Sequence, residues 1–392
     1  MKFLVLLLLT VSTLYGQHTE LEASKLCKVS VKGKWGFSTT EGELVVAPIY
    51  DEVGEFREGL AAVQKEGKFG YINSKGLVVI PMEYDNAFAF YDGRALVKKD
   101  QHYGFLNTEG AISIPFIYNY GWHFLSNGLA YVQQAGKWGF INKEGKVVVP
   151  LIYDFVQGFT GSLAGVGKGS KIGLVNTEGK IIMPIFCDRV GEFSEGLIAV
   201  ARNKQGGYMN QDGKLEIQMI YQATSPFSEG VAAVQMNRKW GYIDKKGKEL
   251  LDYQYEEARP FKDGVAVVLQ EGKWKLINKT GNNLLTKSYD QLGTFDQGIA
   301  QVQKAGKIGF INTNGKEIIP LIYTNSASTV FSENLMAVEK EGKWGYIDLS
   351  GALVIPFVYD NAENFVQGLA KVQQNSKWGY LNKKGLIVLW QE

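Results

Sequence analysis

Three histidines, His18, His102 and His123, are the side chains of this 392-residue chain best suited to metal binding or acid–base chemistry. None has a second His, a Cys or a paired carboxylate at the spacing of a metal site. The stretch 165–169 (Gly-Val-Gly-Lys-Gly) resembles a phosphate-binding loop, but it lies between two strand-like runs, where a hairpin turn is expected. We therefore expect no enzyme activity, no metal site and no cofactor.

Acidic residues recur at one position along the chain. The recurring aspartates are Asp51, Asp85, Asp154, Asp188, Asp290 and Asp360. They could form a row of cation ligands, or they could be turn residues whose carboxylates accept backbone N–H groups. We favour the turn role, because Asn119, Gln222, Glu256 and Thr324 replace the aspartate at the equivalent positions.

Lysines recur in the same way. They are Lys34, Lys68, Lys137, Lys171, Lys239, Lys273, Lys307, Lys343 and Lys377. Such a row could attract an anionic polymer, or it could keep hairpins soluble and discourage pairing between sheet edges. The net charge is only +2, which favours the second interpretation and gives no indication of nucleic-acid binding.

Tryptophans follow several of these lysines, and they are our candidate binding residues: Trp35, Trp138, Trp240, Trp344 and Trp378. If exposed, they would form a ladder suited to stacking on sugar rings or to protein contacts. The alternative, which we favour for the rings as a set, is that they fill the space between stacked sheets. Two irregular segments are further candidates: 122–127, which contains Trp122 and His123, and 325–330, which contains two inserted residues.

A repeat positions all of these residues. One glycine recurs at 36, 70, 104, 139, 173, 207, 241, 309, 345 and 379, with Lys275 at the missing place; the spacing is 34 except for one of 35 and one of 36. A second glycine follows six residues later in every case, from Gly42 to Gly385. The chain therefore contains eleven tandem repeats of about 34 residues.

Each repeat predicts three short antiparallel strands. In the second repeat these are residues 60–65, 68–73 and 77–80. Glu66-Gly67 suits a two-residue hairpin turn, and Asn73 with Gly76 suits a type I turn. Recurring linker residues, exemplified by Tyr84 and Phe90, predict ordered and packed connections. One such sheet buries too little apolar surface to be stable alone, so neighbouring repeats must stack.

The repeated motifs resemble those of bacterial WG (Trp-Gly) repeats. They include Trp35-Gly36-Phe37 and Trp344-Gly345-Tyr346, and the segments Pro150–Asp154 and Pro356–Asp360. The resemblance covers nearly all of the chain after its N-terminal segment and implies a β-rich interaction repeat without a common activity. The Trp position holds Phe69, Tyr103, Ile172, Gly206 and Ile308 in other repeats, and Trp274 is followed by Lys275, so those units depart from the pattern.

We expect an all-β, open and superhelical stack of three-stranded meanders, with a propeller-like ring as the alternative. Propellers typically have four to eight four-stranded blades. Rings also often build one blade from both chain ends, whereas here both ends fall at repeat boundaries. These two considerations favour the open array.

The N-terminus carries Lys2 and a short apolar run, 3–9, as in a secretory signal peptide. We assign 1–16 to the signal peptide, 17–24 to a short linker and 25–390 to the array, with no transmembrane segment in the mature chain. Cys27 and Cys187 lie in distant repeats, so packed, independent thiols are expected.

These features predict an exported, non-catalytic scaffold in the periplasm, on the outer surface or outside the cell. A protein is the expected partner. Binding of a cell-wall or surface glycan through the repeated aromatic residues is the alternative.

Overall fold

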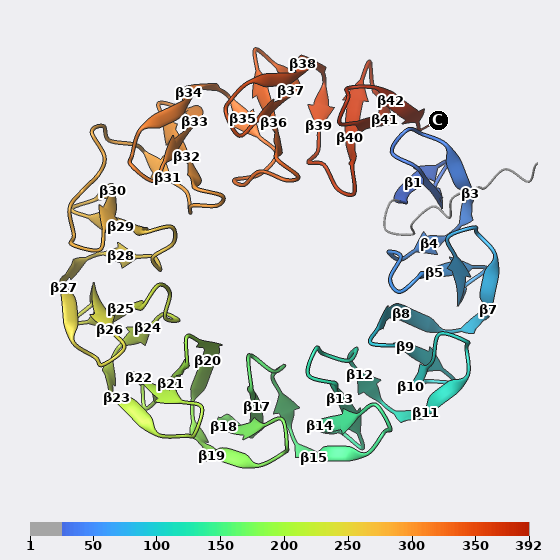
Figure 1. The fold of residues 1–392 in the computed structure, drawn as a ribbon, viewed down its shortest axis with the longest axis horizontal. Helices are drawn as coiled ribbons and strands as arrows, with labels where there is room; N and C mark the ends of the chain where they lie inside the picture. Colours follow the sequence, from blue (N-terminus) through green and yellow to red (C-terminus); the bar gives the residue numbers. More distant parts are fainter. Residues whose placement is uncertain (1–25, 392) are drawn as a thin grey trace, which may run out of the picture.

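The computed structural model describes residues 26–391 as eleven small antiparallel sheets arranged in a closed ring around a wide central opening (Figure 1). The predicted signal peptide, 1–16, and the linker, 17–24, lie outside the described residues. We call each sheet a blade and number the blades with the repeats. No helix long and apolar enough to span a membrane is present between residues 26 and 391.

The second and third strands of each blade form the predicted hairpin. The second strands are β1 (Cys27–Val31), β5 (Leu60–Lys65), β9 (Arg94–Lys99), β13 (Leu129–Gln134), β17 (Leu163–Lys168), β21 (Leu197–Arg202), β25 (Val231–Met236), β29 (Val265–Gln270), β32 (Ile299–Lys304), β36 (Leu335–Lys340) and β40 (Leu369–Gln374). In the second blade Glu66 and Gly67 have φ of 53° and 79°, as a type I′ turn requires. The glycine-rich stretch 165–169 belongs to the same kind of hairpin.

The third strands carry the Trp-Gly motif. They are β2 (Lys34–Ser38), β6 (Lys68–Asn73), β10 (His102–Leu106), β14 (Lys137–Asn142), β18 (Lys171–Asn176), β22 (Gln205–Asn210), β26 (Lys239–Asp244), β30 (Lys273–Asn278), β33 (Lys307–Asn312), β37 (Lys343–Asp348) and β41 (Lys377–Asn382). Each ends in the predicted turn. Asn73 Oδ1 accepts the backbone N–H groups of Lys75 and Leu77, and Gly76 takes φ of 77°.

The outer strands lie on the rim of the ring (Figure 1). They are β3 (Leu44–Tyr50), β7 (Val78–Tyr84), β11 (Ile112–Tyr118), β15 (Val147–Tyr153), β19 (Ile181–Cys187), β23 (Leu215–Tyr221), β27 (Glu249–Tyr255), β34 (Glu317–Tyr323), β38 (Leu353–Tyr359) and β42 (Ile387–Trp390). In the second blade this strand continues past the predicted end at residue 80, through Pro81 to Tyr84.

A fourth strand, nearest the central opening, comes from the linker. These strands are β4 (Glu52–Val53), β8 (Asn86–Tyr91), β12 (Tyr120–Gly121), β16 (Phe155–Val156), β20 (Arg189–Ser194), β24 (Ala223–Thr224), β28 (Glu257–Ala258), β31 (Gln291–Leu292), β35 (Asn325–Ser326) and β39 (Asn361–Ala362). The prediction of three-stranded units was therefore incomplete: nine of the eleven described sheets have four strands, because the linker pairs with the next hairpin.

The motif glycine allows the outer strand to bulge. In the second blade Phe69 pairs with Tyr84 and Tyr71 with Ile80, so three outer-strand residues face the single residue Gly70. A Cβ at Gly70 would lie 2.8 Å from the backbone nitrogen of Met82. The eighth blade confirms the requirement, because Lys275 replaces the glycine and this blade has no outer strand, only a bridge between Ile277 and Asn283.

The hydrophobic core lies between blades. Behind the second blade, Leu60, Tyr71 and Ile80 pack against Phe90 and Val97 of the third. The rings of Tyr71 and Phe90 meet nearly edge to face with centroids 4.9 Å apart, and equivalent pairs recur at other junctions. The linker anchors are thus core residues, as predicted.

The ring overturns the expectation of an open array. Closure needs no shared blade, because the first and eleventh blades meet through side chains (Figure 1). Cys27 and Val29 pack against Leu369 and Tyr380. Gln391 Nε2 donates to Ser30 Oγ at 2.8 Å.

Further polar contacts complete this seam. Cys27 Sγ donates to the carbonyl of Gln367 at 2.8 Å, and Asn382 Nδ2 donates to the carbonyl of Thr40 at 3.2 Å. Cys27 and Cys187 are both buried and form no disulfide, as predicted.

Candidate binding surface

The repeated acids and lysines join neighbouring blades. Asp154 Oδ1 accepts from Lys137 of the fourth blade at 2.6 Å, and Oδ2 accepts the backbone N–H of Gly169, in the hairpin of the fifth, at 2.7 Å. We call this arrangement a clasp: a carboxylate that accepts from a lysine of one blade and from a hairpin N–H of the next. The same lysine–carboxylate pairs form between Lys34 and Asp51, Lys68 and Asp85, Lys171 and Asp188, Lys239 and Glu256, and Lys343 and Asp360. As predicted, these carboxylates accept backbone N–H groups. The N–H groups belong to the hairpin of the next blade, however, and not to a turn beside the aspartate.

The electrostatics agree with this structural role. The Lys137 ammonium, with the Gly169 N–H, holds the pKa of Asp154 below its ordinary value. Lys34 and the Glu66 N–H do the same for the pKa of Asp51. Within residues 26–391 no cluster of three His, Cys, Asp or Glu side chains is arranged to hold a metal ion.

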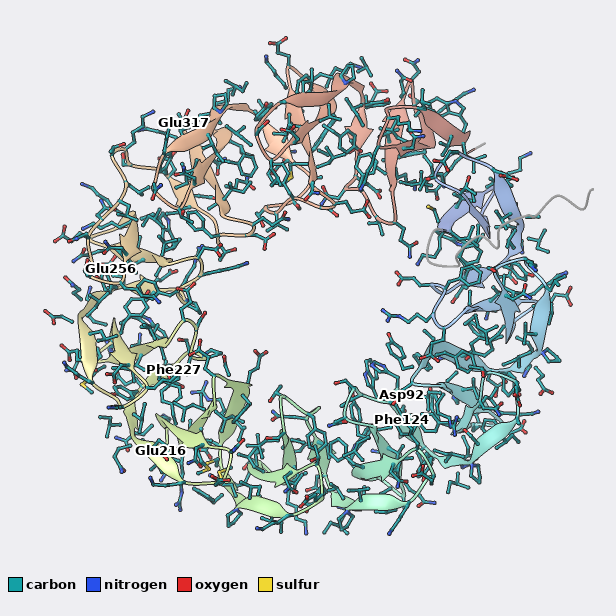
Figure 2. The ribbon with its side chains drawn as sticks, viewed as in Figure 1. Asp92, Phe124, Glu216, Phe227, Glu256 and Glu317 are labelled. Atoms are coloured by element: carbon teal, nitrogen blue, oxygen red, sulfur yellow. The ribbon has the colours of Figure 1, made fainter. Side chains whose placement is uncertain are left out.

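A second set of hydrogen bonds between blades joins neighbouring linkers. Glu58 accepts the backbone N–H groups of Asp92 and Gly93 in the next linker, at 2.6 and 2.9 Å. Glu195, Glu229 and Glu333 make equivalent bonds to Gly230, Gly264 and Gly368. Figure 2 places Asp92 beside the central opening, whereas Glu216, Glu256 and Glu317 lie toward the rim.

The five motif tryptophans are half-buried, each on the third strand of its blade. Trp240 and Trp344 pack at the edges of inter-blade cores and pair with Tyr255 and Tyr359 across the bulge. Trp35 lines a cavity of about 380 Å³ at the seam between the first and eleventh blades. Trp378 lies under the Lys371 ammonium, 4.9 Å from the ring centroid. Trp344, Trp378 and Trp35 lie in three consecutive blades across the seam, but no ring contact joins any of these four tryptophans in the described structure.

Trp138 differs, because the fourth blade gathers further aromatic residues around it. Tyr120, Trp122 and Tyr131 occupy positions that are not aromatic in most other blades. At the position of Trp122 stand Gly54, Phe88, Gln157, Gly191, Ser225, Arg259, Gly293, Ala327 and Glu363. The backbone bond from Trp122 N to Tyr131 O, matched by Ser225 to Ala233 and Arg259 to Val267, confirms this equivalence. We call Tyr120, Trp122, Tyr131 and Trp138 the aromatic face.

The rings of the aromatic face are ordered against one another. Trp122 and Tyr131 are stacked with centroids 6.0 Å apart and planes 6° from parallel. Tyr131 also contacts Trp138 at 6.0 Å, and Trp138 stacks with Tyr120 at 6.4 Å. Tyr120 is 59% exposed and Trp122 44%, so the face is open to solvent. Tyr103 of the third blade extends it, 6.1 Å from Tyr120.

A column of three side chains continues from this face across two more blades. His123 stacks on Tyr91 of the third blade with centroids 4.0 Å apart, and the Arg57 guanidinium of the second lies 4.7 Å from the Tyr91 ring. Tyr91 directly precedes Asp92, which Figure 2 places beside the central opening. We call Arg57, Tyr91 and His123 the central column.

Burial affects the protonation of two side chains in the column and face. Burial, with the nearby Arg57 charge, lowers the pKa of His123, so its imidazole is neutral at pH 7. Burial raises the pKa of Tyr131, so its phenol stays protonated. Rings stacked at fixed spacing offer flat apolar surfaces with polar edges.

Sequence reasoning identified Trp122, His123 and Trp138 but not Tyr91, Tyr120 or Tyr131. Their signal was present in the repeat, since each is an aromatic residue at a position that is not aromatic in most other blades. Arg57 carried no comparable signal, because its linker has the ordinary length.

Comparison with known proteins agrees with the repeat. The sequence pattern of the family described as "WG containing repeat" matches residues 35–69, 69–101, 103–138, 138–171, 172–205, 207–240, 240–274, 276–307, 308–344 and 344–378. A sequence comparison with curated proteins finds no match.

Several solved structures are similar in fold. A eukaryotic initiation factor is 12% identical over 77% of this chain and 96% of its own, with a TM-score of 0.43. An extracellular domain from B. thetaiotaomicron, described as part of a hybrid two component system, is 12% identical over 95% of this chain and 65% of its own, with a TM-score of 0.23. PorZ, a surface component of the type-IX secretion system of Porphyromonas gingivalis, is 12% identical over 91% and 64%, with a TM-score of 0.25. Similarity this low carries no argument about ligands.

Proposed function

The chain belongs to the WG containing repeat family, and from this premise we propose that it is an exported, non-catalytic binding protein whose ring presents the aromatic face to a protein partner. The proposal rests on one observation: in the fourth blade, Tyr120, Trp122 and Tyr131 gather around the motif tryptophan Trp138. Elsewhere the recurrent charged side chains are used to join blades, as at Asp154.

A protein partner fits the composition of this surface. Tyr, Trp and Arg are the residues most enriched among binding hot spots. The aromatic face supplies the first two, and Arg57 at the end of the central column supplies the third. Because ring stacking already orders these side chains, binding would cost little further side-chain entropy.

A glycan is the second candidate, favoured by one specific observation. The nearly parallel rings of Trp122 and Tyr131 offer flat surfaces of the kind on which sugar rings stack. A glycan array probed with the purified protein separates the candidates, since reproducible retention of one glycan by the aromatic face would favour sugar binding.

The repeat itself supplies the variant that tests the binding site. Tyr120→Asn, Trp122→Ser and Tyr131→Ala replace each ring with a residue found at the equivalent position in another blade: Asn86, Ser225 and Ala233. The triple variant should therefore fold. Glu363→Ser is a matched control, because Glu363 occupies the position of Trp122 in the eleventh blade.

The experiment is quantitative co-purification from the native cell envelope. We expect partners recovered with the unmodified protein and the Glu363→Ser control to be depleted at least tenfold with the triple variant. Equal recovery with all three proteins, with circular dichroism unchanged, would contradict the proposed site.

Export is tested separately on the N-terminus of the protein recovered from cells. Cleavage after Gly16 should leave Gln17 as the first residue, which intact-mass measurement detects. Recovery of the uncleaved chain from the cytoplasm would contradict export.

A further inference from the structure

A cavity of about 440 Å³ lies where the eighth, ninth and tenth blades meet. Its lining includes Arg259 and Trp274 of the eighth blade, Gln301 and Gln303 of the ninth and Thr329 of the tenth. This volume is in the range of small-ligand sites, roughly 300–1,000 Å³. Figure 1 shows these blades across the ring from the fourth.

Two departures from the repeat line this cavity, and a third is next to it in sequence. Arg259 occupies the position of Trp122, and the two-residue insertion in 325–330 brings Thr329 to the cavity edge. Lys275, which replaces the motif glycine, directly follows the lining residue Trp274. Insertions in repeat proteins often fall on the binding face.

Asp290, which also lines the cavity, makes only part of the clasp. Asp290 Oδ2 accepts the backbone N–H of Ala305 at 2.7 Å, as in the other clasps. At six other junctions a lysine ammonium pairs with the carboxylate of the clasp. Lys273 forms no such pair with Asp290 in the described structure. Asp290 Oδ1 is thus an acceptor without a partner among the described residues.

Amide side chains lie next to this carboxylate. Gln291 and Gln303 pair directly across β31 and β32, and Gln301 shares a face of β32 with Gln303 because alternate residues of a strand point the same way. Arg259 is held in place, since its guanidinium lies 5.0 Å from the Trp274 ring centroid and Nη1 donates to the Leu292 carbonyl at 2.9 Å.

We propose that this cavity binds one sugar residue of a neutral glycan. Adjacent hydroxyl groups of a sugar both donate and accept, which matches a carboxylate acceptor beside amides that do both. Arg259 and Asp290 have opposite charges, so the lining favours a ligand without net charge. The proposal stands independently of partner binding at the aromatic face.

The equivalent junction between the sixth and seventh blades shows what the repeat alone provides. There a cavity of about 190 Å³ is lined by Gly206 and Gln222 at the positions of Trp274 and Asp290. It has neither the carboxylate nor the pair of glutamines. The larger volume and the polar set at the eighth and ninth blades therefore exceed what that junction provides.

Two variants test the site without disturbing the clasp. Asp290→Asn removes the charge but retains an acceptor for the Ala305 N–H, as Asn119 accepts the Ala135 N–H at the equivalent junction. Thr329→Trp adds bulk from an exposed position at the cavity edge. Asp188→Asn changes the same repeat position at another junction and is the matched control.

The probes are glucose, galactose, mannose and N-acetylglucosamine, with glycine and glutamate as the zwitterionic alternative, measured by saturation-transfer NMR and titration calorimetry. We expect at least one sugar to bind with Kd of about 1 mM or tighter. Asp290→Asn should weaken it about tenfold, because charge-assisted hydrogen bonds are roughly twice as strong as neutral ones. Thr329→Trp should abolish it, and Asp188→Asn and the aromatic-face triple variant should leave it unchanged.

Three results would overturn the proposal: no sugar binds, sugar binding is indifferent to both cavity variants, or only the amino acids bind. Retention of sugar binding by the triple variant also separates this site from the aromatic face.

Discussion

Trp122 and Tyr131 stack with their ring planes 6° from parallel and their centroids 6.0 Å apart. The backbone N–H of Trp122 donates to the carbonyl of Tyr131 at 3.0 Å, so the sheet itself sets the spacing of the rings. The same backbone bond occurs in other blades with Ser225 and Ala233, where no ring is present. Most other repeats have a small residue at the position of Trp122. In the fourth blade this position contributes to an exposed aromatic surface.

The motif glycine should be indispensable to the outer strand. A Cβ at Gly139 would lie 2.7 Å from the carbonyl oxygen of Pro150. We expect Gly139→Ala to cost about 3 kcal/mol, the upper end of the usual cost of overpacking, since contact with backbone leaves little room to relax. Gly136→Ala is the control for backbone strain alone: Gly136 has φ of 76°, so alanine there costs about 1–2 kcal/mol, but its Cβ meets nothing within 4 Å.

Hydrogen exchange localises the effect of this substitution. Protection should fall in residues 147–153 for Gly139→Ala and stay unchanged for Gly136→Ala. Full protection of this segment in Gly139→Ala would contradict the role assigned to the glycine.

Closure of the ring can be tested with two glycines of the first blade. Gly33 and Gly42 have φ of 77° and 93°, so alanine at either is strained, by about 1–2 kcal/mol. Only at Gly42 would the added Cβ also meet the eleventh blade, 2.8 Å from Cβ of Val388. We expect Gly42→Ala to lower Tm distinctly more than Gly33→Ala. Equal shifts would indicate that the two blades are apart in solution.

Acid should loosen the junctions between blades. Lysine and hairpin N–H partners lower the pKa of Asp154, and equivalent lysines act on Asp51, Asp85, Asp188 and Asp360. Because the folded-state pKa is below the unfolded value of about 3.8, the stabilisation is complete above that pH and is lost as the pH falls through the folded pKa. We expect Tm to decline below about pH 4, and less steeply in Asp154→Asn. An identical acid profile for the variant would count against the clasp.

The cysteines should be inert in the folded protein. Burial raises the pKa of Cys27 to about 11 and that of Cys187 to about 11. At pH 8 only about one thiol in a thousand would be ionised, and neither side chain is accessible. We expect no reaction with a thiol reagent until guanidinium is added, and then two equivalents. Rapid modification of the native protein would show that the seam at Cys27 opens.

The repeat and most strands could be predicted because their signals are local. Glu66-Gly67 and Asn73 with Gly76 encode turns that the backbone adopts as expected. Tyr84 and Phe90 were recognisable as anchors because they recur. The fourth strand was missed because segments such as Glu52–Val53 are two residues long and carry no alternating pattern.

Closure of the ring could not be predicted, because it depends on the sum of small rotations between blades. No single repeat encodes that sum, and the seam is formed by residues far apart in sequence, such as Ser30 and Gln391. The cavity at Asp290 was missed for a related reason. Its lining combines residues of three blades, Trp274, Gln303 and Thr329, whose proximity no single repeat encodes.

The proposed binding site is tested most directly by hydrogen exchange of the protein with and without its co-purified partner. Bound partner should protect residues 119–134, which carry Tyr120, Trp122 and Tyr131, and should leave the equivalent residues 360–374 of the eleventh blade unchanged. Protection confined to other blades, with none in 119–134, would contradict binding at the aromatic face.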